Sequence, residues 1–343
     1  MDATKQRTRA SASRRRANRS RSQPPAKRSR AKPVIPGTNV LVTRRTIGRT
    51  LFLNPDAKNA ERLCNFIGYT LGICLERYGL DLHAACFPGN HEHINATDHL
   101  GNLPAFKDTF HAWLARGVNA MRGRFGKFWD GGESVDVHCG DDIFDDELGE
   151  RPDSDFDALV YTLCQVSKHG LLPNGSRYAG FSTYDWRFNE TRTFKRPDWF
   201  YDPTNPEMPN EVSITLKRPK GKRPDLNDDE FYDEMVKRVR AKEIHHKAEH
   251  RKAGRRYLGE EKIAKANWNR APRSKEDHFV AVKRIRGRDN AARRAAIKRS
   301  QTWRARYADA RNRLRAGETD VEFPYGTYWM RRFSGVKVAK PPP

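Results

Sequence analysis

Long apolar runs are absent from this sequence. No stretch approaches the roughly 20 apolar residues that a membrane-spanning helix needs, and the N-terminus lacks the apolar core of a signal peptide. Cysteine is scarce: five residues occur singly in apolar surroundings without a CxxC pair, namely Cys64, Cys74, Cys86, Cys139 and Cys164. A disulfide framework and a zinc ribbon are therefore not expected, and the thiols are predicted to be small core residues of a soluble, intracellular protein.

Negative charge is also in short supply. Lys and Arg number 66 against 43 Asp and Glu, which leaves a formal charge of +23 on 343 residues. An excess spread over several segments indicates a polyanionic partner, most often nucleic acid. Residues 1–33 contain almost no apolar side chains and are predicted to form a disordered basic arm, the alternative being a tail that is merely solvated.

The next segment, residues 34–180, is patterned as a folded α+β domain. Strand patterns at 39–46 and 49–53, which form one strand or a hairpin, and at 82–87, 91–97 and 133–139 alternate with helix patterns that begin at Asn54-Pro55-Asp56 and at Pro104. A further helix, acid-rich at its start, runs over 153–170. The order β-α-β-β-α-β followed by a helix predicts a split βαβ, ferredoxin-like sheet.

The remainder of the chain is less regular. Residues 181–224 hold several prolines and aromatics and are predicted to be a packed but irregular extension. Residues 225–343 are predicted to be a mainly helical basic extension, in which Trp268, Trp303, Tyr307 and Trp329 lie among arginines. These aromatics either stack on unpaired bases or pack the basic helices onto the core.

Two histidines in "PGNHEHINATD" form the first candidate site. His91 and His93 lie two positions apart in a predicted strand, so they share a face about 6.6 Å apart and can converge on one cation. The alternative is a pair of ordinary strand histidines.

The helix in "YTLCQVSKHGLL" supplies the second candidate. At about 100° per residue, Tyr161 and Gln165 lie together, away from the helix's apolar stripe. Such a pair offers a phenol nucleophile beside a neutral oxygen ligand. The non-functional alternative is a half-exposed tyrosine packed under a loop.

Together "PGNHEH" and "YTLCQVSKHGLL" resemble the paired motifs of the single-tyrosine HUH transposases, especially the REP-associated tyrosine transposases. The resemblance covers residues 38 to about 180, and "FPYGTYWMRRF" is similar to a terminal segment of some longer bacterial members. It implies that His91, His93 and Gln165 hold Mg²⁺ or Mn²⁺ and that Tyr161 is the catalytic nucleophile. It further implies a transposase-like strand transferase that cleaves and rejoins single-stranded or hairpin DNA through a 5′-phosphotyrosine.

Such a protein is expected in the bacterial cytoplasm, associated with the nucleoid, as a monomer or homodimer and with no membrane partner. Two other functions remain open on the same scaffold: a relaxase or replication-initiator nickase, and a catalytically inactive DNA- or RNA-binding protein. The candidate DNA-contacting side chains are Arg116, Arg122, Arg124, Lys127, Lys168 and Trp303.

One residue departs from the family pattern. The position between the histidines is usually bulky and apolar because it faces the helices on the opposite side, but here it is Glu92. A buried carboxylate without a partner is costly. We therefore expect either that an Arg or Lys reaches Glu92 or that this face of the sheet is open.

Overall fold

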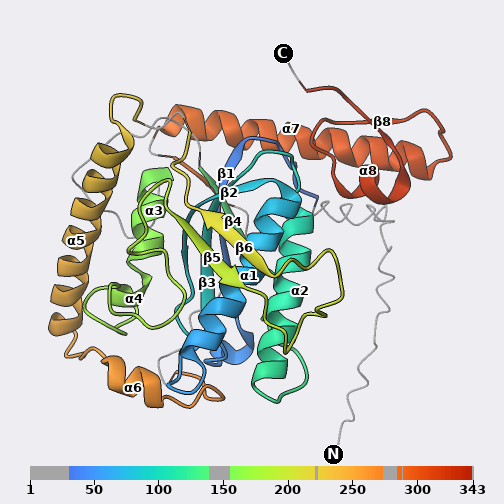
Figure 1. Cartoon of the computed structure of the whole chain (residues 1–343). Helices are drawn as coiled ribbons and strands as arrows, with labels where there is room; N and C mark the ends of the chain where they lie inside the picture. Colours follow the sequence, from blue (N-terminus) through green and yellow to red (C-terminus); the bar gives the residue numbers. More distant parts are fainter. Residues whose placement is uncertain (1–30, 139–154, 221–222, 273–283, 288, 342–343) are drawn as a thin grey trace, which may run out of the picture. The chain divides into compact units, whose positions relative to one another are not determined.

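A five-stranded sheet organises the part of the chain that the computed structural model describes, which is residues 31–138, 155–220, 223–272, 284–287 and 289–341 (Figure 1). All elements below belong to one compact unit, Lys32–Pro343. The strand order is β2-β3-β1-β4-β7, with bounds β1 (Thr38–Arg45), β2 (Leu80–Cys86), β3 (His91–Asp98), β4 (Ser134–His138) and β7 (Arg284–Arg286). The first four strands pair antiparallel, and β7 joins β4 in parallel. A mixed sheet with helices confirms the predicted α+β class.

The strand β3 is buried along its whole length because both its edges are paired and both its faces are covered. Its register places His91 opposite Arg45 and His93 opposite Thr43 on β1. Side chains alternate between faces along a strand. His93 therefore contacts Tyr161 on one side of the sheet, and Glu92 contacts His111 on the other.

Helices α1 (Ala60–Tyr78) and α2 (Leu103–Met121) pack together on the Glu92 side of the sheet. Helix α1 ends at Gly79, whose φ of 68° is in the left-handed region that favours glycine. Its start lies later than the predicted Asn54-Pro55-Asp56, because the Asp56 carboxylate binds Arg122 from the end of α2 instead of capping a helix. Where the helices cross, a Cβ on Gly117 would come within 2.0 Å of the Phe66 ring.

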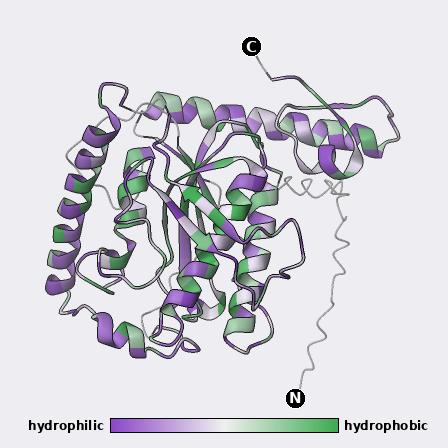
Figure 2. Ribbon diagram, in the orientation of Figure 1, coloured by the Kyte–Doolittle hydropathy of each residue, from purple (hydrophilic) through white to green (hydrophobic). Residues whose placement is uncertain are grey.

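The opposite face carries α3 (Asp155–Leu163) and α4 (Gln165–Lys168), a pair that the sequence predicts as one helix. Cys164 separates them, with φ −83° and ψ 3°. The long helix α5 (Asp228–Lys252) packs along both (Figure 1). In Figure 2 most of α5 is hydrophilic, and the apolar residues that pack it inward are few: Phe231, Met235 and Val239.

An antiparallel hairpin, β5 (Thr191–Lys195) and β6 (Glu211–Thr215), covers α1. It approaches so closely that Cβ atoms on Gly68 and Gly72 would lie 2.3 Å from Phe194 and 2.4 Å from Val212. The sequence predicts this segment as irregular, because its two strands are short and one face of each is polar and exposed.

The C-terminal region also contributes to the sheet through β7, with Arg286 Nε 3.2 Å from Asp136 Oδ2. Its other elements are α6 (Glu260–Lys265), α7 (Asn290–Arg315), β8 (Glu322–Phe323), α8 (Trp329–Ser334) and β9 (Lys337–Val338). One further short helix, η1 (Ile47–Arg49), follows β1. The C-terminal aromatics are expected either to stack on bases or to pack within the protein, and three of them pack within the protein. Trp268 contacts Phe52, and the Trp303 and Tyr307 rings stack 5.1 Å apart.

Three thiols are buried as the sequence predicts, those of Cys74, Cys86 and Cys164. Burial raises the pKa of the Cys74 and Cys86 thiols to about 12, so both are unreactive at neutral pH. The fifth cysteine, Cys139, and most of the predicted basic arm over 1–33 lie outside the described residues. Within the described residues, no helix combines the length and apolarity needed to cross a membrane.

The contact between α1 and α2 predicts the effect of a single methyl group. Gly117→Ala should lower the free energy of unfolding by about 1–3 kcal/mol, because the added Cβ overlaps the Phe66 ring and a packed core tolerates overfilling poorly. Denaturant unfolding measures the change. The matched control is Gly131→Ala, where nothing lies within 4 Å of the new Cβ and the change should stay within about 0.5 kcal/mol. Equal stabilities for the two variants would contradict this packing.

Candidate functional site

His91 and His93 form a cluster at the start of β3, facing α3. Their ring centroids are 4.9 Å apart, and the His93 ring lies 5.4 Å from that of Tyr161. The two-residue spacing on a strand thus brings both imidazoles to one face, as predicted. The same face brings in the tyrosine of the following helix.

Each histidine is held by its Nδ1 atom. His91 Nδ1 lies 2.7 Å from Asn90 Oδ1, and His93 Nδ1 lies 3.1 Å from Thr43 Oγ1. An amide oxygen only accepts, so His91 Nδ1 carries the proton and its Nε2 keeps a lone pair. Both Nε2 atoms are buried and have no hydrogen-bond partner among the described residues.

The protonation state of the two imidazole rings suits coordination of a metal ion. Burial lowers the pKa of His91 and His93 well below the usual value, and electrostatic coupling to His169 and to Arg45 lowers it further. Both imidazoles are therefore neutral at physiological pH. Neutral imidazole is the form that coordinates a divalent cation.

Tyr161 is half-buried and its phenol oxygen has a cationic neighbour. Lys168 donates to Tyr161 Oη over 3.2 Å, and its ammonium also lies 4.3 Å from the ring centroid. The helical spacing of seven residues explains why Lys168 reaches back over the same face. Lys168 is a sequence candidate for DNA contact, and the structure places it beside the proposed nucleophile.

Gln165 begins α4, directly after the break at Cys164. Its amide nitrogen donates to Tyr161 O over 2.7 Å, which leaves Oε1 turned toward the histidines. His169 Nε2 lies 3.1 Å from that oxygen, and the His169 ring is 4.6 Å from the His91 ring. The predicted helix over 153–170 includes His169, but the sequence assigned it no place in the site. Its spacing of four from Gln165 was the signal that could have placed it here.

Helix α5 braces the backbone that carries these groups. Ser167 Oγ lies 2.9 Å from His246 Nδ1, and His250 Nε2 lies 3.1 Å from both Ser167 O and Lys168 O. These contacts occupy the last carbonyls of α4, which a helix end otherwise leaves unsatisfied. The prediction of a mainly helical basic extension over 225–343 did not include this role, because the contacts of His246 and His250 join residues about 80 positions apart.

Glu92 is fully buried on the other face, and its partner is neither an Arg nor a Lys. His111 Nε2, from α2, donates to Glu92 Oε1. Both expectations for Glu92 are therefore wrong: the face is closed, and an imidazole supplies the hydrogen bond. His111 lies on the buried side of α2 beside Phe110, and the sequence alone does not pair it with Glu92.

Not all of the other candidates converge on the cluster. Arg122 is buried, where it binds Asp56 and the carbonyls of Phe52 and Asn54, so its guanidinium is committed to the fold. Trp303 donates to Tyr325 O at the far end of the sheet. The remaining three candidates lie on α2 or the turn after it: Arg116 and Lys127, which are exposed, and Arg124, which is half-buried.

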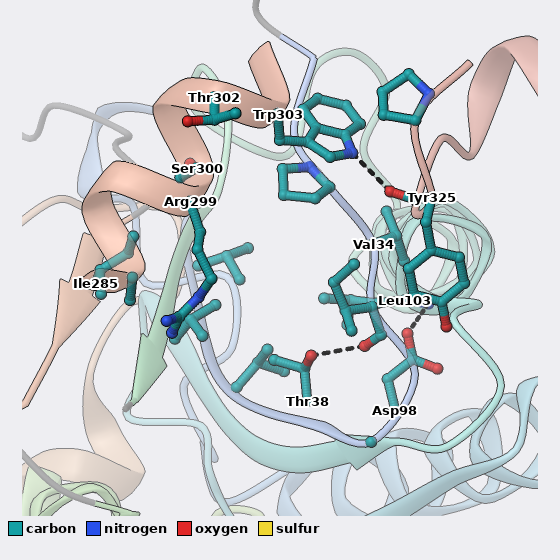
Figure 3. Close-up of a pocket in the computed structure, with 18 of the residues that line it drawn as sticks. Val34, Thr38, Asp98, Leu103, Ile285, Arg299, Ser300, Thr302, Trp303 and Tyr325 are labelled. Atoms are coloured by element: carbon teal, nitrogen blue, oxygen red, sulfur yellow. Dashed lines mark hydrogen bonds between the residues drawn. The ribbon is translucent and has the colours of Figure 1, made fainter. Parts of the chain in front are cut away.

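A cavity of about 1440 Å³ lies between α7 and the sheet (Figure 3). Its floor includes Val135, Val137 and Ile285, and Figure 3 shows Arg299 extending into it from α7. Asp98 lines it and is the last residue of β3, whereas His91 is the first. Seven strand steps of about 3.3 Å separate the two residues by about 23 Å. The cavity is therefore distinct from the histidine cluster, which has the chemistry.

The histidine cluster is not a complete metal cage by itself. Within the described residues, no group of three or more His, Cys, Asp or Glu side chains is arranged to hold an ion. Two buried imidazole nitrogens without partners, with an amide oxygen beside them, do fit a divalent cation that takes its remaining ligands from substrate or water.

No protein-family model matches the sequence, and no curated protein is similar to it. Among solved structures, the chain is similar to one described as a REP-associated tyrosine transposase bound to a REP hairpin. The TM-score is 0.33 and the identity 12%, over 46% of this chain and 82% of that chain. A TM-score of this size is too low to establish a shared fold.

The buried pair of Glu92 and His111 predicts strong coupling. His111→Phe alone leaves the carboxylate buried without its donor and should cost about 3–5 kcal/mol of unfolding free energy. Adding Glu92→Met removes the charge and should recover most of that loss. Denaturant unfolding of both single variants and the double variant gives the coupling energy. A loss below about 1 kcal/mol for His111→Phe would show that the pair is not formed.

Proposed function

We propose that this chain is a metal-dependent DNA strand transferase of the single-tyrosine HUH type, similar to the REP-associated tyrosine transposases. It cleaves and rejoins single-stranded or hairpin-tipped DNA. One observation carries the proposal: two buried, neutral imidazoles have Nε2 atoms without a hydrogen-bond partner among the described residues, on the same face of the sheet as Tyr161.

The sheet supports this assignment. The antiparallel order β2-β3-β1-β4, with α1 and α2 as the crossovers on one face, is that of a split βαβ, ferredoxin-like sheet. In such a sheet β3 is central, so a strand buried on both sides positions the histidines rigidly. The helix with Tyr161 then covers the face that the two histidines share, opposite to α1 and α2.

His91 Nε2, His93 Nε2 and Gln165 Oε1 would hold the divalent cation. When bound, this ion supplies Lewis-acid polarisation of the scissile phosphate. Asn90 Oδ1 fixes the tautomer of His91 so that its Nε2 keeps a lone pair, and Thr43 orients the His93 ring through its Nδ1 atom.

Tyr161 is the nucleophile. Its phenol oxygen attacks phosphorus in line, the bond from phosphorus to the 3′ oxygen breaks, and a 5′-phosphotyrosine forms. The phenol proton is lost to solvent and the departing 3′ oxygen takes one up. Lys168, 3.2 Å from the phenol oxygen, stabilises negative charge as it develops there. Attack by a 3′-hydroxyl reverses the step and restores the phosphodiester.

The role of Tyr161 as the nucleophile is tested by removing its phenol oxygen. Tyr161→Phe should abolish a protein–DNA adduct that survives denaturation, because no oxygen remains to join phosphorus. DNA binding, measured by gel shift, should stay within about threefold, or about 0.7 kcal/mol, because only one hydroxyl is removed. Tyr232→Phe, on the outer part of α5 beside Arg187, is the matched control and should keep the adduct. Persistence of the adduct in Tyr161→Phe would exclude Tyr161, and a gel shift without any adduct in the wild-type chain would favour an inactive binding protein.

The metal site is tested by binding rather than by activity. The wild-type chain should bind one Mn²⁺ in isothermal titration calorimetry, and His91→Ala or His93→Ala should each weaken it by more than about tenfold. Asn90→Ala should cost about 10- to 100-fold, because it releases the ring of His91. His99→Ala is the control, since His99 pairs with Asp81 beyond the other end of β3. Equal Mn²⁺ affinity in all four variants would contradict a metal site here.

A further inference from the structure

Phe125 is 96% exposed, the highest value among the exposed large hydrophobic residues of the described chain. It lies in the turn that follows α2, at the bottom of Figure 1. Large aromatic side chains are normally buried, and an isolated ring in water contributes nothing to folding. The packing of this domain therefore does not explain the residue.

The backbone conformation of the turn holds the Phe125 ring outward. Gly123 and Gly126 flank it with φ of 60° and 98°, and nothing lies within 4 Å of a Cβ at either. These conformations suit glycine and create a tight projection. The turn is fixed from below, because Asn119 Nδ2 donates to Gly126 O over 3.1 Å.

Two arginines pin the same turn. Arg124 binds Asn119 Oδ1, donates to Lys127 O over 3.1 Å, and lies 3.9 Å from the Phe52 ring centroid. Arg122, on the other side of Gly123, is anchored in the core by Asp56. Arg122 and Arg124 therefore fix the backbone just before Phe125, and this backbone conformation exposes the ring.

The turn lies at the catalytic end of the sheet. Asp130 N donates to Arg45 O over 2.8 Å, and Arg45 pairs with His91 across β1 and β3. The chain leaving the turn is therefore two strand spacings from His91, about 10 Å. Ile47 N also donates to Phe128 O over 2.8 Å, so the turn with Phe125 lies at the same end of the sheet as His91.

The charges around Phe125 favour nucleic acid over protein. Lys127 is exposed and Arg124 is half-buried, and both lie in the same turn as Phe125. Asp130, half-buried, is the acidic side chain nearest in sequence. A protein-docking site normally offers a contiguous apolar patch, whereas a single ring among cations suits one base and its phosphates.

We infer that Phe125 is a stacking platform for an unpaired base of the DNA strand, held by the Arg122–Phe128 turn at the same end of the sheet as the Tyr161 site. The inference rests on the proposed function for its partner, DNA, and adds where an unpaired base is held. Stacking on an aromatic ring does not depend on base identity, so the platform recognises single-stranded character and not sequence.

The test measures equilibrium binding of the full-length chain, without divalent cation so that no cleavage occurs. Two fluorescein-labelled DNAs are compared: a hairpin with a ten-nucleotide single-stranded extension, and a blunt hairpin of equal charge. Phe125→Ala should weaken binding of the extended hairpin by about 5- to 150-fold, the range for losing one base stack, and should leave the blunt hairpin unchanged. Phe125→Trp should restore the preference.

Salt dependence separates stacking from charge. Phe125→Ala should leave the slope of log affinity against log salt unchanged, because no phosphate contact is lost. Lys127→Ala should flatten that slope by about 0.7, the value for one phosphate on a single strand. Phe333→Ala is the control for an exposed aromatic elsewhere, on α8, 68% exposed.

Each remaining outcome has one meaning. Unchanged affinity of Phe125→Ala for both DNAs would overturn the platform while leaving the Tyr161 proposal intact. Equal weakening of both DNAs, or a flattened salt slope, would also overturn it, because the ring would then act through duplex or phosphate contacts. A wild-type chain that binds neither DNA would refute the proposed function itself, and the platform with it.

Discussion

Side-chain alternation on β3 is the constraint on which the rest of the structure depends. The strand is paired on both edges, so its register is fixed and each residue is committed to one face. His91 and His93 face Tyr161, and Glu92 faces His111 between them. A slip of one residue would bury the carboxylate in the histidine cluster and turn both imidazoles into the packing of α1 and α2. The buried pair of Glu92 and His111 can thus specify the register as well as occupy space.

The catalytic side of the sheet depends on a second, more distant support. Helix α4 has only four residues and follows a break, so its own hydrogen bonds cannot hold Gln165 and Lys168 in place. Helix α5 supplies the missing contacts through His246 and His250. Its Glu243 accepts hydrogen bonds of 3.0 Å from Gly175 N and Tyr184 Oη, which fix the segment after α4. The basic C-terminal region is therefore part of the site's framework.

The distribution of positive charge follows the same division between framework and surface. Arg122 is used inside the fold, while Lys168 is placed at the phenol oxygen and Lys127 is left in solvent near Phe125. The net charge of +23 accordingly does not describe one uniform binding surface. The cavity under α7 and the histidine cluster lie at opposite ends of β3, so a large cavity alone would have indicated the wrong end for the chemistry.

The sequence by itself determined the features that depend on local periodicity. The two-residue spacing put His91 and His93 on one face, the four-residue spacing placed Gln165 one turn after Tyr161, and most strands and helices fall close to their predicted bounds. Only the tertiary structure decided the partners: His111 for Glu92, Asp56 for Arg122, and His246 and His250 for the carbonyl and hydroxyl groups of α4. Those pairs are 19, 66 and about 80 residues apart, and no period within one element carries information about which side chain packs opposite it. Burial decided the rest, because it keeps a histidine neutral and makes an arginine part of a structural ion pair, and burial exists only once separate elements pack.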